Sequence, residues 1–313
     1  MRRFIFGAIP LSALFVLLWS SGLVGSKFGL GYAGTFTLLM WRYVLVVITL
    51  AALVFALRAW RPMSKTECLY HLLVGVLSHA IYLSSSLRAM DLGVSVGLVA
   101  FVLALQPMLT AVISAPLTGE KTAFHQWLGL CLGLLAVLLV VGDRLSLGGS
   151  PLAYGLLLLS TVAISIATLM NRRLEIYAQK NAALETPILM VLLIHCTGSL
   201  LCLIPLAGAI EGYQANWQPS LVFAVTFLAL VVSLGAYGLM FVLMRKLPVI
   251  KVSCLLYLSP PATMIIAYFI FGERLAVVDM IGLAIAGVAV WIVSRPTLGA
   301  DIELGSVNQA SKA

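Results

Sequence analysis

Charged residues are scarce in this sequence. Only 10% of its 313 residues are charged, whereas 62% are apolar, and the mean hydropathy is +1.11. A soluble domain of this length cannot bury so much apolar surface away from water. The scarcity of charge therefore excludes a water-soluble protein, and a lipid bilayer must be the solvent.

Motifs of nucleotide, redox and metal chemistry are also missing. No glycine-rich phosphate-binding loop is present, which excludes ATP-driven pumping by this chain alone. The five cysteines are scattered through apolar stretches without a CxxC pair, and the four histidines lack metal-ligand spacing. We therefore expect no metal, no cofactor and no enzymatic activity.

Apolar runs of helix length fill nearly the whole chain. A helix needs about 20 apolar residues to cross the hydrocarbon core, where the backbone must satisfy its own hydrogen bonds. The runs lack strand alternation, so the sequence predicts an all-α integral membrane protein of ten transmembrane helices. The start, Met1-Arg2-Arg3 before an apolar run, could indicate a signal peptide, but no small-residue cleavage site follows a short core, and we expect this helix to be retained. The ten runs are 4–25, 35–57, 69–88, 93–116, 124–141, 152–170, 187–207, 221–244, 249–271 and 275–294.

The net charge of +8 is distributed unevenly between the two sides of such a bundle. Of the 19 basic residues, fourteen fall in loops on one side or at the termini, and one, Arg42, lies inside the second run. The positive-inside rule places the basic side, with both termini, in the cytoplasm, which predicts a multi-pass protein of the cell membrane and no nucleic-acid partner. The polar tail 296–313 is expected to be a disordered cytoplasmic segment. The four basic residues of the other side are Lys27, Arg88, Arg144 and Arg274.

The two halves of the sequence resemble each other. With an offset of 153 residues, Pro107 falls on Pro260 and Gly129 on Gly282. We expect two five-helix repeats, residues 1–145 and 150–295. Five is an odd number, so the second repeat enters the membrane from the opposite face, and inverted repeats are suited to alternating access.

Short motifs recur along the chain: Leu18-Trp19-Ser20-Ser21, Lys27, Trp41-Arg42-Tyr43, Leu105-Gln106-Pro107, Gly119-Glu120-Lys121, Leu258-Ser259-Pro260 and Gly272-Glu273-Arg274. In these motifs the sequence resembles the EamA-like members of the drug/metabolite transporter superfamily. The resemblance covers nearly the whole chain. It implies a ten-helix inverted-repeat carrier, often an exporter of amino acids or other small metabolites.

Polar and aromatic side chains recur at similar depth in several predicted helices, while acidic residues do not. Because an intramembrane carboxylate is the usual ion relay, its absence favours facilitated transport or coupling through His79. Arg42 could bind an anionic group of the substrate, or else snorkel to the headgroups or pair with Asp91. His79 could instead form an interhelical hydrogen bond. The predicted substrate-binding residues are Trp19, Ser21, Arg42, His79, Tyr82, Gln106, Tyr237, Tyr257 and Ser259.

Proline and glycine suggest how the helices bend and pack. Pro107 and Pro260 remove backbone donors within their runs and are predicted hinges. Gly129, Gly133 and Gly282 would let the fifth and tenth helices pack closely on each other, or on a second subunit in a homo-oligomer.

The leading hypothesis is a secondary transporter of a small polar or amphipathic metabolite, for example an amino acid exporter. Its partners would be the small-molecule substrate and the lipid bilayer. The alternative is an intramembrane enzyme or lipid-handling protein, which an acidic pair or a metal cluster in the spans would favour. Neither occurs in the sequence.

Overall fold

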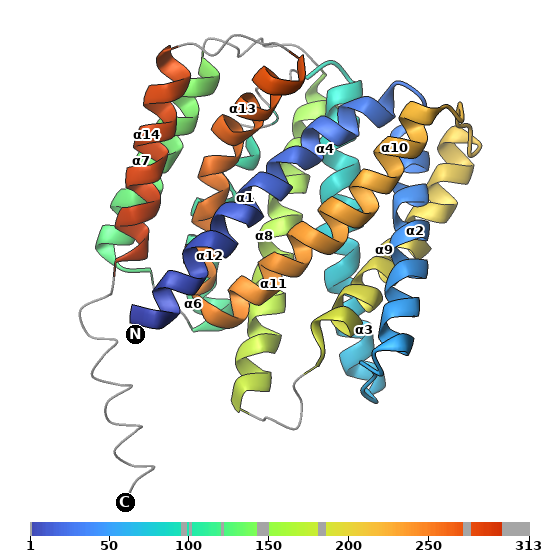
Figure 1. The fold of residues 1–313 in the computed structure, drawn as a ribbon, viewed down its shortest axis with the longest axis horizontal. Coiled ribbons are helices and arrows are strands. Elements are labelled where there is room, and N and C mark those ends of the chain that lie inside the picture. Colours follow the sequence, from blue (N-terminus) through green and yellow to red (C-terminus); the bar gives the residue numbers. More distant parts are fainter. Residues whose placement is uncertain are drawn as a thin grey trace, which may run out of the picture.

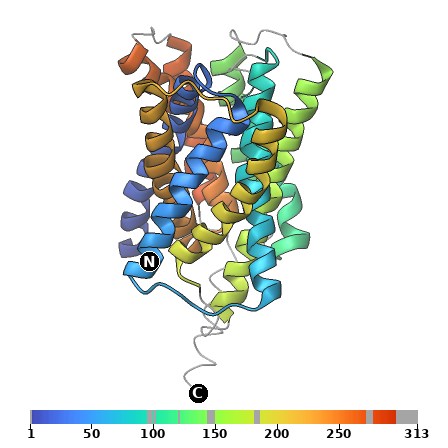
Figure 2. The same ribbon diagram turned by 90° about the vertical axis from the view of Figure 1, so that its right-hand side faces the viewer.

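The computed structural model describes residues 2–94, 99, 102–119, 122–142, 150–180, 186–271 and 277–295. Within these ranges no strand forms, and one isolated β-bridge joins Ala33 to Ala215. Figures 1 and 2 show the helices side by side in one bundle, with their connections gathered at its two ends. In chain order the helices are α1 (Arg2–Leu30), α2 (Thr35–Ala56), α3 (Lys65–Gly75), η1 (Val76–Ile81), α4 (Tyr82–Asp91), α6 (Gln106–Thr118), α7 (Phe124–Gly142), α8 (Pro151–Lys180), α9 (Ile188–Glu211), α10 (Pro219–Phe227), η3 (Leu228–Ala236), α11 (Tyr237–Lys246), α12 (Val249–Cys254), η4 (Leu255–Leu258), α13 (Ser259–Phe271) and α14 (Val277–Ser294).

Five helical stretches of the described chain are long and apolar enough to cross a membrane, and further apolar helices are shorter. Large apolar side chains such as Phe55, Phe124 and Phe269 are 87%, 78% and 78% exposed, as expected where lipid is the solvent. The all-helical membrane fold is thus confirmed, while the count of ten spans stays a prediction. The five long stretches are Thr35–Ala56, Lys65–Asp91, Pro151–Ala178, Ile188–Glu211 and Pro219–Lys246.

Helices of the two predicted repeats pack in a reciprocal pattern. α2 packs along α9, and α7 packs along α14, so that equivalent helices meet each other (Figure 1). α1 packs against α13 and η3 of the second repeat. Its counterpart α8 packs in the same way against α6, η1 and α4 of the first repeat. A two-fold relation between the repeats would produce this exchange of partners.

Two of the long stretches contain a π-helical segment in their middle. η1 interrupts Lys65–Asp91, and η3 interrupts Pro219–Lys246. These stretches occupy equivalent places in the two predicted repeats. A π-helix is a helix with an inserted residue, it is rare, and it occurs often at functional sites. The duplicated π segments therefore indicate that a functional site lies at the middle of these two helices.

The predicted hinges lie where helices start rather than in their interiors. Pro107 falls in the first turn of α6, directly after a turn at Ala104 and Leu105. Pro260 falls in the first turn of α13, after the 3-10 helix η4. A proline in a first turn removes a donor that has no partner there anyway. The helical path continues through η4 into α13, and Leu105 before α6 also keeps helical dihedral angles, so a hinge at either proline stays a prediction.

One end of the bundle is tied by contacts between the repeats. The Glu211 carboxylate at the end of α9 accepts hydrogen bonds from the backbone amides of Phe36 (3.0 Å) and Thr37 (2.7 Å) in the first turn of α2. A carboxylate is favoured at a helix N-terminus, where unpaired amides carry partial positive charge. At the same end, the Asn216 amide donates to the Tyr32 carbonyl at 2.8 Å. These hydrogen bonds thus join the two repeats at this end.

Several sequence expectations concern glycines. A Cβ atom on Gly129 would lie 2.6 Å from Val293 of α14, and one on Gly133 would lie 2.4 Å from the Tyr257 ring. These two glycines therefore serve close packing within this chain, Gly282 is buried in α14, and a homo-oligomer stays a prediction. Gly119 ends α6 with φ of 77°, as expected for a helix terminator. The Lys27 side chain and residues Glu120, Lys121, Gly272, Glu273, Arg274 and 296–313 lie outside what the structure describes.

Candidate functional site

Three of the predicted residues form an aromatic cluster in the middle of the bundle. The Trp19 ring of α1 lies 4.9 Å from the Tyr237 ring and 6.4 Å from the Tyr82 ring, measured between centroids. Tyr82 is the first residue of α4, directly after η1, and Tyr237 is the first residue of α11, directly after η3. The two tyrosines thus hold equivalent places in the two repeats, and Trp19 contacts both.

His79 packs against this cluster. Its ring centroid lies 4.1 Å from that of Tyr237 and 5.4 Å from that of Tyr43, and its side chain is fully buried. The Tyr237 hydroxyl donates a 3.0 Å hydrogen bond to the Ser78 carbonyl. Neither ring nitrogen of His79 has a hydrogen-bond partner among the described residues. The interhelical hydrogen bond considered for His79 is therefore absent from the described contacts.

Arg42 is buried in the protein rather than directed to the membrane surface. Its residue is 2% exposed, its Nε atom donates to the Ser233 hydroxyl at 2.8 Å, and its guanidinium carbon lies 5.4 Å from the Tyr43 ring centroid. Asp91 instead accepts a 2.6 Å hydrogen bond from Thr35 and lies 3.5 Å from Arg88. Snorkelling and pairing with Asp91 are both wrong for this conformation.

The buried guanidinium has no counter-anion in the described part of the chain. Ion pairs of described residues join Arg61 to Glu67, Arg88 to Asp91 and Arg245 to Glu175, and none of these involves Arg42. The Arg42 Nη2 atom is buried without a hydrogen-bond partner among the described residues. Taking a cation out of water is costly unless an anion or several hydrogen bonds compensate for it. Arg42 can therefore still accept an anionic partner.

Serine contacts connect α1 with α13. The Ser20 hydroxyl donates toward the Ser259 hydroxyl at 3.0 Å, and the Thr263 hydroxyl lies 3.4 Å from the Ser20 carbonyl. Ser21 differs, since its hydroxyl bonds to the Leu18 carbonyl of its own helix at 2.7 Å. Ser259 therefore belongs to an interhelical contact next to Trp19, whereas the Ser21 hydroxyl is already used locally.

Two predicted residues have no described contact with the aromatic cluster. Tyr257 packs in a separate apolar core with Leu130 and Cys254, and its ring fills the space beside Gly133. Its buried hydroxyl has no hydrogen-bond partner among the described residues. Gln106 is buried in the first turn of α6. The structure thus groups five of the nine predicted residues: Trp19, Arg42, His79, Tyr82 and Tyr237.

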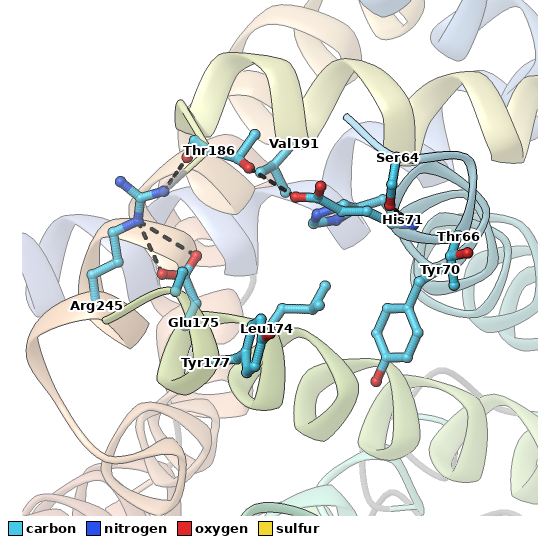
Figure 3. A pocket seen from close by; sticks show the side chains of 12 residues that line it. Ser64, Thr66, Tyr70, His71, Leu174, Glu175, Tyr177, Thr186, Val191 and Arg245 are labelled. Atoms are coloured by element: carbon cyan, nitrogen blue, oxygen red, sulfur yellow. Dashed lines mark hydrogen bonds and ion pairs between the residues drawn. The ribbon is translucent and has the colours of Figure 1, made fainter. Parts of the chain in front are cut away.

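A cavity of about 390 Å³ opens beside the ends of α3, α8, α9 and α11 (Figure 3). Arg245 reaches across to Glu175, 3.2 Å away, and donates to the Thr186 carbonyl at 2.5 Å. The Thr186 hydroxyl in turn lies 3.4 Å from Glu67, which pairs with Arg61. This cavity lies at the end opposite the Glu211 contact. Its lining residues are Ser64, Thr66, Glu67, Tyr70, His71, Leu174, Glu175, Tyr177, Ala178, Thr186, Val191 and Arg245.

Sequence reasoning missed several residues of the site. Tyr43 and Ser233 contact His79 and Arg42, and His195 lies 6.3 Å from His79 between ring centroids. Tyr43 was visible in the Trp41-Arg42-Tyr43 motif. Ser233 gave no signal, because a lone serine in an apolar run is common in membrane helices.

Comparisons with known proteins agree over nearly the whole chain. The model of a family described as the EamA-like transporter family matches residues 6–142 and again residues 151–295. A chloroplastic WAT1-related protein of Arabidopsis thaliana is 25% identical over 287 residues, which is 89% of this chain and 67% of the plant protein. A solved crystal structure superposes with a TM-score of 0.74 at 18% identity, covering 92% of this chain and 97% of the other, and so shares the fold.

Proposed function

Since the chain belongs to the EamA-like transporter family, we propose that it is a secondary carrier that exports a small amphipathic metabolite with a carboxylate, such as an amino acid. The single observation that carries the choice of substrate is Arg42, a buried cation without a carboxylate among the described residues. A substrate carboxylate would supply the missing charge. A guanidinium binds a carboxylate through two parallel hydrogen bonds, which a lysine cannot reproduce.

The aromatic cluster supports an amphipathic rather than a purely polar substrate. The rings of Trp19, Tyr82 and Tyr237 form the cluster. The guanidinium of Arg42 lies beside the Tyr43 ring, and the His79 ring lies between Tyr43 and Tyr237. Apolar and aromatic surface with a few placed polar groups is typical of small-molecule sites. The carboxylate would thus bind to Arg42 and the apolar body to the aromatic rings.

Two observations support alternating access by a ten-helix inverted repeat. The family model matches each half separately, and equivalent helices exchange partners between the halves. The Glu211 hydrogen bonds join the repeats at one end of the bundle, while the cavity beside Arg245 opens at the other. Three basic residues, Lys65, Arg172 and Lys246, lie toward the cavity end, which supports a cytoplasmic location for that end. The described conformation then faces inward.

The test is efflux from proteoliposomes loaded with an equimolar mixture of the twenty L-amino acids, with the external medium analysed by mass spectrometry. Each amino acid that leaves is compared with its carboxamide, which lacks the negative charge. We expect transport of the acid and at least tenfold slower transport of the amide. Arg42→Lys and Arg42→Gln should each lower affinity roughly ten- to a hundredfold, because charge-assisted hydrogen bonds contribute about 1.5–3 kcal/mol.

The matched control is Arg88→Gln, which removes an arginine whose side chain is 42% exposed at a bundle end. It should transport like the unaltered protein. Wild-type affinity in Arg42→Lys would refute recognition of a carboxylate by the two-pronged guanidinium. Equal transport of acids and amides would refute the choice of an anionic group.

A further inference from the structure

Three histidines form a line from the cavity to the central cluster. His71 lines the cavity, and its Nδ1 atom lies 3.1 Å from the Nε2 atom of His195 on α9. The His195 ring centroid lies 6.3 Å from that of His79, which packs on Tyr237. The three histidines therefore alternate between the predicted repeats: His71 and His79 belong to the first, and His195 between them belongs to the second.

Three buried ring nitrogens of these histidines have no hydrogen-bond partner among the described residues. His195 Nδ1 and both nitrogens of His79 are buried without hydrogen-bond partners among the described residues. Buried polar atoms are nearly always paired, and each unpaired one costs about 1–3 kcal/mol. Three such atoms in neighbouring rings are hard to explain as packing. They are expected where the rings must accept and release a passing proton.

We propose that His71, His195 and His79 form a proton relay between the cavity and the central cluster, so that the carrier moves a proton together with its anionic substrate. The relay itself rests on the histidine line, and its coupling to a substrate rests on the proposed function. Imidazole is suited to this role because its two nitrogens can accept a proton on one side and release one on the other.

The proton passes along the three histidine rings in order. A proton from cavity water binds to the free ring nitrogen of His71, and the proton on His71 Nδ1 passes to Nε2 of His195. His195 then releases the proton on Nδ1 toward His79. A centroid separation of 6.3 Å leaves this last step within reach of a bridging water or a small ring rotation. Each of the first two rings ends neutral with its proton on the other nitrogen, and rotation of the ring restores the starting arrangement. His79 holds the transferred proton as an imidazolium until it is released on the other side together with the substrate.

The charged groups near the three histidines determine whether the proton and the substrate move in the same direction or in opposite directions. The charge of Arg61 acts on His71. The titratable groups that line the cavity together with His71 are Glu67 and Tyr70 on its own side and Glu175, Tyr177 and Arg245 across it.

His195 faces the other two histidines, and His79 faces Arg42, Tyr43 and Tyr237. The positive charge of Arg42 opposes a second positive charge on His79. A substrate carboxylate on Arg42 removes that opposition, since opposite charges favour each other. Proton and carboxylate therefore bind together and move in the same direction.

The experiment measures proton flux in proteoliposomes that contain the dye pyranine, with the membrane potential clamped by valinomycin and equal potassium. A pH step is applied with and without the twenty-amino-acid mixture on one side. We expect proton flux above that of protein-free vesicles, accelerated when the mixture moves in the same direction. His195→Gln and His71→Gln should each lower the flux at least tenfold, while His125→Gln, which alters a histidine outside the line, should not.

Amino acid exchange at equal pH on both sides is measured in the same vesicles, and it reports on the carrier proposal separately. Exchange that persists in His71→Gln while proton flux falls would support both proposals. Histidine-dependent proton flux without any exchange would overturn the carrier and leave the relay. Proton flux that is equal in His195→Gln, His71→Gln and the unaltered protein, or no greater than in empty vesicles, would overturn the relay. Circular dichroism and gel filtration confirm that each variant is folded.

Discussion

The Nε atom of Arg42 donates a 2.8 Å hydrogen bond to the hydroxyl of Ser233, which joins α2 to the π-helix η3. This bond connects the buried cation to the segment that immediately precedes Tyr237. The position of the guanidinium is thus tied to the local geometry of η3.

Replacing Ser233 should reveal this dependence. Ser233→Ala leaves Arg42 Nε without its hydrogen bond, and we expect a loss of about 1.5–3 kcal/mol of stability, since the bond involves a charged group. Ser233→Thr retains the hydroxyl and serves as the control. Thermal unfolding in detergent should show a clearly lower midpoint for Ser233→Ala than for Ser233→Thr. Equal midpoints for the two variants would mean that the bond contributes nothing.

The contact between α3 and α9 should not tolerate any added side chain. A Cβ atom on Gly75 would lie 2.1 Å from the backbone oxygen of His195, so Gly75→Ala must push the two helices apart. We expect little folded protein in the membrane, because the two helices can no longer pack at this distance. In Gly155→Ala the new Cβ meets nothing within 4 Å, and helix propensity favours alanine by up to about 1 kcal/mol. Fluorescence-detected gel filtration compares the two, and a normal Gly75→Ala profile would contradict the close approach.

The Glu211 carboxylate should hold one end of the bundle closed. Glu211→Gln removes the charge that binds the Phe36 and Thr37 amides, which weakens the contact by roughly 0.5–2 kcal/mol. The population open at this end should then rise by about two- to thirtyfold. The measurement is the labelling rate of Ala33→Cys by an impermeant maleimide, with Arg88→Gln as a control at the same end. Unchanged labelling would show that Glu211 does not limit opening.

The orientation can be tested with the exposed residues Tyr213 and Ser64 at opposite ends. In a background with the five cysteines replaced, we expect Tyr213→Cys to react with an impermeant reagent on intact cells and Ser64→Cys to react only after permeabilisation. A cysteine in the segment 296–313 should behave like Ser64→Cys. The reverse pattern would place the termini outside.

Depth in the membrane could be predicted from the sequence, but the direction of a side chain around its helix could not. Trp19, Tyr82 and Tyr237 were expected together because they occupy similar depths, and they do meet. Tyr257 has a similar depth yet packs in another core. In a soluble helix the apolar stripe shows which face is buried, whereas here lipid and protein interior favour the same residues. Depth along the helices therefore predicted how far into the membrane the site lies, but it did not predict which residues belong to the site.

The sequence pattern could not predict the local helix geometry either. Nothing in the run around His79 distinguishes a π-helix from an α-helix, because both present apolar residues to the same surroundings. The positions of Pro107 and Pro260 were visible in the sequence, but the turn before the first and the 3-10 helix before the second were not. The carboxylate of Glu211 was not predicted to cap α2, since its partners lie 175 and 174 residues away in the chain.

The π segments carry a mechanical consequence for the two helices that contain them. Each holds surplus backbone relative to an α-helix, in which one residue corresponds to about 100° of rotation. If η1 or η3 tightened into α geometry, the part of the helix beyond it would turn like a screw about its axis, without breaking its remaining hydrogen bonds. Tyr82 and Tyr237 are the first residues beyond the two segments. Rotation of either helix would therefore move one tyrosine away from Trp19. Because the π segment is duplicated, each half of the molecule contains one helix that can rotate in this way.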